Sequence, residues 1–217
     1  MGRLTLVRHG QARSFHPEQP LTPLGEAQAA HLAAWWLRHG IAYDEVETGC
    51  LARQIRTEQA VAEAFRAAGR DWPEARRDPA WNEYDATAVL ATLGQPLPED
   101  NRGFQKLLES GMIRWLAGEL AGPHIEPWPT FRDRVSTALA RVQSGSPGRR
   151  VAVFTSGGVI GFAVHVAMHS PPPVFLDVNW RIRNASLTEF LYDRARLTLD
   201  AFNRIGHLED ETLWSYR

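Results

Sequence analysis

Short apolar runs alternate with longer amphipathic stretches over the first third of the chain. Residues 4–7 predict a buried strand, which Gly10 ends. Thr22 and Pro23 then have the residue types expected at a helix N-cap and at the first helical position, and Gly40 suits the end of that helix. We expect the buried stripe of this helix to consist of Leu24, Ala27, His31, Ala34, Trp35 and Arg38.

The same alternation continues along the chain. A short strand around Val46 precedes a second amphipathic helix, which ends at Gly69. Further helices are predicted over residues 104–120, 131–142 and 157–168, and further strands over 149–155, 185–192 and 197–202. This order of elements predicts an α/β fold with a mostly parallel central sheet and helices on both faces.

Residues 70–130 interrupt the alternation. They contain Pro73, Pro79, Pro96, Pro98, Pro123, Pro127 and Pro129 around one helical piece. We expect a cap-like helical excursion over the carboxyl edge of the sheet, within a single domain that spans residues 1–217.

Composition limits the classes of partner. The chain has 217 residues, 44% of them hydrophobic, which is enough for one large domain with a full core. The net charge of -1 provides no overall field for nucleic acid or for an anionic membrane. Cys50 is the single cysteine, no apolar stretch approaches the length of a membrane span, and no signal peptide is apparent, so we expect a cytoplasmic protein.

Arg8, His9 and Gly10 stand at the carboxyl end of the first strand, where open α/β sheets place their ligands. A neutral imidazole is a competent nucleophile near pH 7, and a guanidinium binds phosphoryl oxygens bidentately. The triplet alone is equally compatible with a strand end followed by a polar turn.

Six motifs in order change that balance. They are LVRHGQ (6–11), LTPLGEAQA (21–29), TGCLARQIRT (48–57), WNEYD (81–85), TSGGVIG (155–161) and NASLTEF (184–190). Together they resemble the histidine phosphatase superfamily over residues 3–205, the group that includes phosphoglycerate mutases and many small phosphomonoesterases. The resemblance implies a phosphoglycerate mutase-like fold.

The resemblance also implies roles for single residues. His9 matches the nucleophile, which attacks phosphorus and forms a phosphohistidine that water hydrolyses. Arg8 and Arg53 match the pair that clamps the phosphoryl oxygens, and the motif register selects Arg53 over Arg56.

Glu83 matches the general acid. That role needs a raised pKa, and its aromatic neighbours Trp81 and Tyr84 are suited to exclude water from the carboxyl group. Asp85 lies nearby in the same motif and remains an alternative acid.

Ser156 departs from the family pattern, which has a second histidine at this position. A serine hydroxyl donates one hydrogen bond and adds no positive charge, while the amides of Ser156 and Gly157 still begin a helix and suit an anion. His165 lies about 13 Å farther along that helix by the helical rise and is therefore too far away to substitute. His16, in the loop after the nucleophile motif, is the candidate substitute. Since the surrounding strand–turn–helix matches the family layout, Ser156→His is expected to raise turnover.

The sequence therefore favours a phosphomonoesterase that needs no cofactor and no metal and acts on a small phosphorylated substrate. A mutase is disfavoured because residues 11–20, QARSFHPEQP, lack the asparagine of the mutase segment. A phosphate-ligand binding or regulatory protein with weak turnover remains the alternative, because of Ser156. A serine hydrolase requires glycine where Phe154 stands.

The substrate and the oligomeric state stay open. Five basic residues are candidates for holding a second anionic group of the substrate, namely Arg102, Lys106, Arg114, Arg132 and Arg134.

Overall fold

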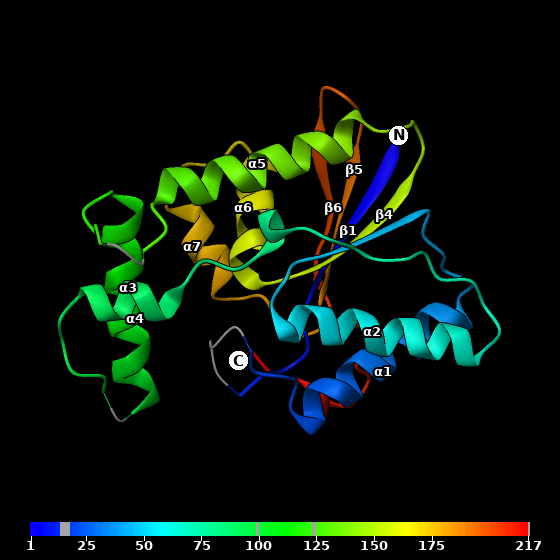
Figure 1. Cartoon of the computed structure of the whole chain (residues 1–217), viewed down its shortest axis with the longest axis horizontal. Helices are drawn as coiled ribbons and strands as arrows, with labels where there is room; N and C mark the ends of the chain where they lie inside the picture. Colours follow the sequence, from blue (N-terminus) through cyan, green and yellow to red (C-terminus); the bar gives the residue numbers. More distant parts are fainter. Residues whose placement is uncertain (14–17, 99, 123–124, 217) are drawn as a thin grey trace.

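The computed structural model describes residues 1–13, 18–98, 100–122 and 125–216, and a six-stranded sheet forms its centre. The strands are β1 (Gly2–Arg8), β2 (Glu45–Thr48), β3 (Arg76–Arg77), β4 (Arg150–Thr155), β5 (Leu187–Tyr192) and β6 (Leu197–Arg204), in the spatial order β3-β2-β4-β1-β5-β6 (Figure 1). The first four strands pair in parallel, and β5 and β6 add an antiparallel edge. The predicted mostly parallel sheet is confirmed.

Helices cover both faces of this sheet (Figure 1). On one face lie α1 (Pro23–Arg38) and α2 (Ala52–Ala67), and on the other α5 (Trp128–Ser144) and α6 (Gly157–Ala167), with the short α7 (Val174–Asn179) against α6. Single 3-10 turns are formed by Pro79–Trp81 and Glu211–Leu213. No helix in the described ranges is long and apolar enough to cross a membrane.

The start and the end of α1 agree with the sequence prediction. Thr22 Oγ1 accepts a hydrogen bond from the backbone N–H of Gly25 at 3.1 Å, and Pro23 is the first helical residue. Gly40 follows the helix with φ of +60°, a conformation that glycine adopts without steric cost.

The predicted buried stripe of α1 is wrong. The buried residues are Gly25, Gln28, Ala29, Leu32, Ala33 and Trp36. The stripe is rotated because the polar Gln28 faces inward, where its amide bridges two loops. Its Oε1 accepts from Gln11 N at 2.8 Å, and its Nε2 donates to Leu213 O at 2.7 Å and to Ser215 Oγ at 2.9 Å.

Residues 70–130 do not all leave the sheet, because β3 pairs with β2 at its edge. The helical part consists of α3 (Ala86–Thr92) and α4 (Asn101–Leu116), which form a lobe at the left of Figure 1. The sequence analysis did not predict α3 or α7. Helix α7 starts directly after Pro173, whose ring fixes φ near the helical value.

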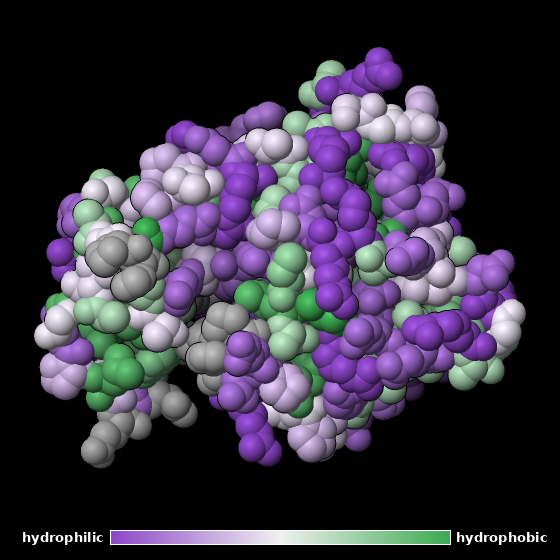
Figure 2. Space-filling model, viewed as in Figure 1, coloured by the Kyte–Doolittle hydropathy of each residue, from purple (hydrophilic) through white to green (hydrophobic). Residues whose placement is uncertain are grey.

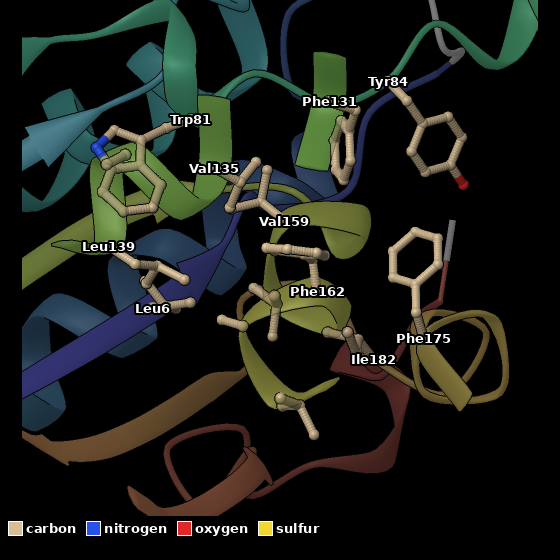
Figure 3. Close-up of a cluster of buried hydrophobic side chains, with 14 of the residues drawn as sticks. Leu6, Trp81, Tyr84, Phe131, Val135, Leu139, Val159, Phe162, Phe175 and Ile182 are labelled. Carbon is tan, nitrogen blue, oxygen red and sulfur yellow. The ribbon is translucent and has the colours of Figure 1, made fainter. Parts of the chain in front are cut away.

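The larger core cluster lies between α5, α6 and the sheet and is rich in aromatic rings (Figure 3). The ring of Phe131 is fully buried, and its centroid lies 6.1 Å from those of Phe162 and Phe175. Tyr84 joins this cluster, 6.0 Å from Phe131, and its hydroxyl accepts from Asn179 Nδ2 at 3.0 Å. The core therefore continues into the segment that carries the candidate acid.

Phe131→Ala is expected to lower the free energy of unfolding by about 3–5 kcal/mol, because it leaves a cavity among rings that cannot close around it. Phe202→Ala is the matched control, since Phe202 is 37% exposed on β6. Urea denaturation followed by tryptophan fluorescence measures both losses. Equal losses in the two variants would contradict this description of the core.

Candidate active site

His9 is the first residue after β1, and its ring is held from both sides. Nδ1 lies 2.7 Å from the carbonyl oxygen of Gly10, which can only accept, so Nδ1 carries the proton. Nε2 then has the lone pair and accepts from Arg53 Nε at 3.1 Å. The neutral ring presents Nε2 as its nucleophilic atom.

The surroundings keep this ring neutral. His9 is 7% exposed, and burial lowers its pKa well below the ordinary 6.5, assisted by the positive charges of Arg53 and then Arg8. The hydrogen bond to Gly10 opposes this shift. The nucleophilic form is therefore populated at neutral pH.

Two helices close on the turn that follows His9. The N–H of Gly10 donates to Thr57 Oγ1 of α2 at 3.0 Å. A Cβ atom on Gly10 would lie 2.5 Å from the carbonyl oxygen of Gly25 in α1, so only glycine fits there. The motifs that contain Gly25 and Thr57 thus hold the nucleophile turn.

Asn184 is a site residue that the sequence analysis did not single out. Its side chain is fully buried, and Nδ2 donates to the carbonyl oxygen of His9 at 3.2 Å, beside a backbone bond of 3.2 Å from Ala185 N. Its position at the start of the NASLTEF motif was a usable signal. Asn184 fixes the backbone of the nucleophile.

The two arginines of the helix α2 motif have different environments. Arg53 is 3% exposed and contacts His9, whereas Arg56 lies at the surface and pairs with Glu26 and Glu63, both at 2.8 Å. Arg8 donates to the carbonyl of Ile182 and also lies close enough to lower the pKa of His9. The structure brings Arg8, His9 and Arg53 together.

Glu83 lies at the N-terminus of α6. Its two carboxyl oxygens accept from Gly158 N at 3.1 and 3.0 Å, and Oε1 also accepts from Tyr84 N at 3.2 Å. A Cβ atom on Gly158 would come within 2.2 Å of Glu83 Oε1, so this close approach requires glycine. The backbone holds the carboxyl group in one place.

Burial raises the pKa of Glu83, while its hydrogen bonds and the charges of Arg53 and Arg8 oppose the rise. Asp85 has a different role: it is exposed, and its side chain accepts from Ala88 N at 2.9 Å as the N-cap of α3. Of the two candidate acids, Glu83 alone has surroundings suited to proton donation near neutral pH.

Ser156 follows β4 as His9 follows β1, because Arg8 and Thr155 are register partners. Its side chain is fully buried, and Oγ accepts from Gln54 Nε2 at 2.9 Å. The sequence analysis did not identify Gln54, although its position at N3 of α2 is one at which glutamine often caps a helix.

The orientation of the Gln54 amide is fixed by two backbone groups. Oε1 accepts from Leu51 N at 3.2 Å, and Nε2 donates to Trp81 O at 3.0 Å. The second proton of Nε2 must therefore point at Ser156, which accepts it. Ser156 Oγ is therefore the acceptor in this contact.

Neither of the other two histidines considered at this position is placed at Ser156 by the described residues. His165 lies toward the far end of α6, where Nδ1 is 3.1 Å from Ser170 Oγ. His16 lies outside the described residues. Among the described residues, Gln54 is the polar side chain that the structure places on Ser156.

A small cavity of about 50 Å³ opens beside the arginine and the acid. It is lined by Arg8, Glu83, Tyr84, Leu108, Asn179, Trp180 and Tyr216. The site thus combines a neutral ring nitrogen, two guanidinium groups, a helix N-terminus and a carboxyl group of raised pKa.

Comparisons with known proteins identify the family and the fold. Residues 4–205 match the model of the histidine phosphatase superfamily (branch 1). A search of curated protein sequences gave no match.

Solved structures share the fold at low sequence identity. Bacillus stearothermophilus YhfR is 18% identical, with a TM-score of 0.71, over 96% of this chain and 100% of that one. A putative alpha-ribazole-5'-P phosphatase from Escherichia coli is 20% identical, with a TM-score of 0.70, over 94% and 97%. A mutant phosphoserine phosphatase from Entamoeba histolytica, in complex with phosphoserine, is 18% identical, with a TM-score of 0.68, over 96% and 100%.

The contact between Gln54 and Ser156 changes the expectation for Ser156→His. An imidazole at this position needs space that the Gln54 amide occupies, so the single substitution is expected to lower turnover through crowding. The double variant Ser156→His with Gln54→Ala provides that space. We expect the double variant to exceed the single one by about tenfold or more in kcat on an aryl phosphate.

Gln54→Ala alone is the control, because it removes the donor to Ser156 without adding a charge. A single Ser156→His variant that is as fast as the double variant would show that Gln54 does not restrict this position.

Proposed function

Because the chain belongs to the histidine phosphatase superfamily, we propose that it is a phosphomonoesterase that acts through a phosphohistidine on His9 and requires no cofactor. The observation that carries the proposal is the pair of contacts at the ring, Gly10 O on Nδ1 and Arg53 Nε on Nε2. These contacts supply the tautomer, the lone pair and the neighbouring cation that attack on phosphorus needs.

In the first step, the phosphoryl group takes the place of the direct Arg53–His9 contact. Arg8, Arg53 and the N-terminal groups Ser156 and Gly157 of α6 hold its oxygens. His9 Nε2 forms a bond to phosphorus as the ester P–O bond breaks in line. Glu83 gives its proton to the departing alcohol oxygen and is left as a carboxylate.

In the second step, the Glu83 carboxylate takes a proton from a water molecule as the water oxygen attacks phosphorus. The P–N bond breaks, the electron pair returns to His9 Nε2, and inorganic phosphate is released. Glu83 is again protonated and His9 is again neutral, so the cycle closes.

The phosphoserine complex of the Entamoeba histolytica relative supports a small phosphorylated molecule as the substrate class. A phosphate-binding or regulatory role with little turnover is the alternative, and one observation favours it: the buried Gln54–Ser156 pair is neutral where the family has a histidine. Turnover of an aryl phosphate that depends on His9 distinguishes the two.

His9→Ala is expected to reduce turnover of 4-nitrophenyl phosphate by about a thousandfold or more and to abolish trapping of a phosphoenzyme. The adduct of the parent protein should be labile in acid and stable in base. His165→Ala is the matched control, because His165 lies away from the site and should change neither readout. An adduct that survives in His9→Ala would assign the nucleophile elsewhere.

Glu83→Gln is expected to slow hydrolysis of alkyl phosphates by about 10²–10⁴-fold and of 4-nitrophenyl phosphate by less than about tenfold, since only the alkoxide needs a proton.

The pH profile gives a second readout. Since the pKa of Glu83 is raised, the parent protein should keep its acid protonated to higher pH than an ordinary glutamate and lose alkyl phosphate turnover above that point. The low pKa of His9 places loss of the nucleophile at the acidic end. Glu83→Gln should lack the alkaline decline. Asp85→Asn is the control. Equal slowing of alkyl phosphates and of 4-nitrophenyl phosphate by Glu83→Gln would contradict the role of Glu83.

A further inference from the structure

The cavity at the acid is small, with a volume of about 50 Å³. A leaving group must begin at Glu83, because its oxygen receives the proton there. A larger group can extend from Glu83 past two of the side chains that line the cavity.

Those side chains are Trp180 and Tyr216, and both also line a much larger groove of about 960 Å³. The groove lies between α4, which contributes Gln105, Glu109 and Ile113, and the region of α7. Leu108, on the same helix α4, lines the small cavity. The cavity and the groove therefore lie next to each other, on either side of Trp180 and Tyr216.

The wall of this groove is mixed, and its apolar part includes exposed hydrophobic side chains. Ile113 is 61% exposed and Tyr216 is 46% exposed, which makes them two of the few large hydrophobic side chains that face solvent. Pro173 and Leu176 lie on the opposite side, and Trp180 adds a second aromatic ring at the junction. Figure 2 shows hydrophobic side chains on the surface of the lobe that α3 and α4 form. Two rings at the junction favour a flat ring of the ligand.

The charges of the groove do not suit a second anionic group. Glu109 and Asp177 line it, against the single guanidinium of Arg181. The five basic residues that the sequence analysis named as candidates for a second anion line neither the groove nor the cavity. Three of them form ion pairs elsewhere: Arg114 with Glu119, Arg132 with Asp133, and Arg134 with Glu126.

Both aromatic side chains stand on fixed backbone. Trp180 ends α7, where its N–H donates to Leu176 O at 3.1 Å. Tyr216 follows Ser215, whose carbonyl accepts from Asn184 N at 2.9 Å and whose Oγ donates to Asn184 Oδ1 at 2.9 Å. The groove is therefore built before a ligand arrives, which lowers the entropic cost of binding.

From these observations we infer that the groove between α4 and α7 binds the leaving group of the substrate, and that this group is an uncharged alcohol with an aromatic or other flat ring. The inference rests on the proposed function of the same site. This inference predicts that the protein prefers phosphomonoesters whose alcohol carries a bulky ring to those whose alcohol carries a carboxylate.

The test compares three alkyl phosphates whose alcohols are all poor leaving groups: 2-naphthylmethyl phosphate, ethyl phosphate and 2-phosphoglycolate. We expect the parent protein to favour the naphthylmethyl ester over the ethyl ester by about tenfold or more in kcat/KM, and to use 2-phosphoglycolate least. Trp180→Ala should remove most of this preference, measured as the ratio of kcat/KM for the two esters, and Trp180→Phe should retain it. Trp35→Ala is the matched control, because Trp35 is also a half-buried tryptophan and lies on the distant helix α1.

Asp177→Lys provides an independent measurement, because it reverses one charge without removing an apolar contact. It should raise the ratio of kcat/KM for 2-phosphoglycolate over ethyl phosphate severalfold.

Equal kcat/KM for the naphthylmethyl and ethyl esters, or a preference that Trp180→Ala leaves intact, would overturn the assignment of the groove. Such a result would leave the proposed function standing if turnover still depends on His9. Turnover that persists in His9→Ala would instead overturn the proposed function.

Discussion

The direct contact between Arg53 Nε and His9 Nε2 is the interaction on which the rest of the site depends. It exists only because Gly10 O holds the proton on the opposite ring nitrogen, and because α2 begins close enough to the end of β1 for Arg53 to reach the ring. Residues of the surrounding motifs hold the backbone of His9 in place. Thr57 binds the turn after the ring, Gly25 leaves space for that turn, and Asn184 holds the carbonyl behind it. A phosphoryl group that replaces the contact inherits a ring and a guanidinium that are already oriented.

His9 and Glu83 show how one environment shifts the pKa of two groups in opposite directions. His9 is buried and Glu83 is half-buried, and desolvation disfavours the charged form of each, which is the acid form of an imidazole and the base form of a carboxyl group. Desolvation therefore lowers the pKa of His9 and raises that of Glu83. Arg8 and Arg53 strengthen the effect at His9 and weaken it at Glu83, so at Glu83 desolvation has to exceed two cations and the amide of Gly158.

Much of the fold and of the site could be predicted from the sequence, because the predicted features are local. The strand before His9, the cap of α1 at Thr22 and the position of Arg53 in the first turn of α2 follow from short patterns. The features that could not be predicted depend on contacts between distant segments. Gln28 is buried because it bridges the nucleophile turn and the C-terminal tail, and the local stripe of apolar residues contains no sign of that. The contact of Gln54 could not be predicted for the same reason, because its partner Ser156 is 102 residues away.

The Gln54–Ser156 pair also affects how much charge the site contains. A charged imidazole in place of Ser156 would add a third cation to Arg8 and Arg53, and each buried charge without a partner is expensive. The neutral pair avoids that repulsion, since each polar atom of the Gln54 amide has a partner in the described structure. The compensating disadvantage arises when a dianionic phosphoryl group binds, because a hydroxyl proton opposes its charge less than a cation does. A site built in this way has to obtain more of its affinity from the leaving group, which is consistent with a groove that carries two aromatic rings near the acid.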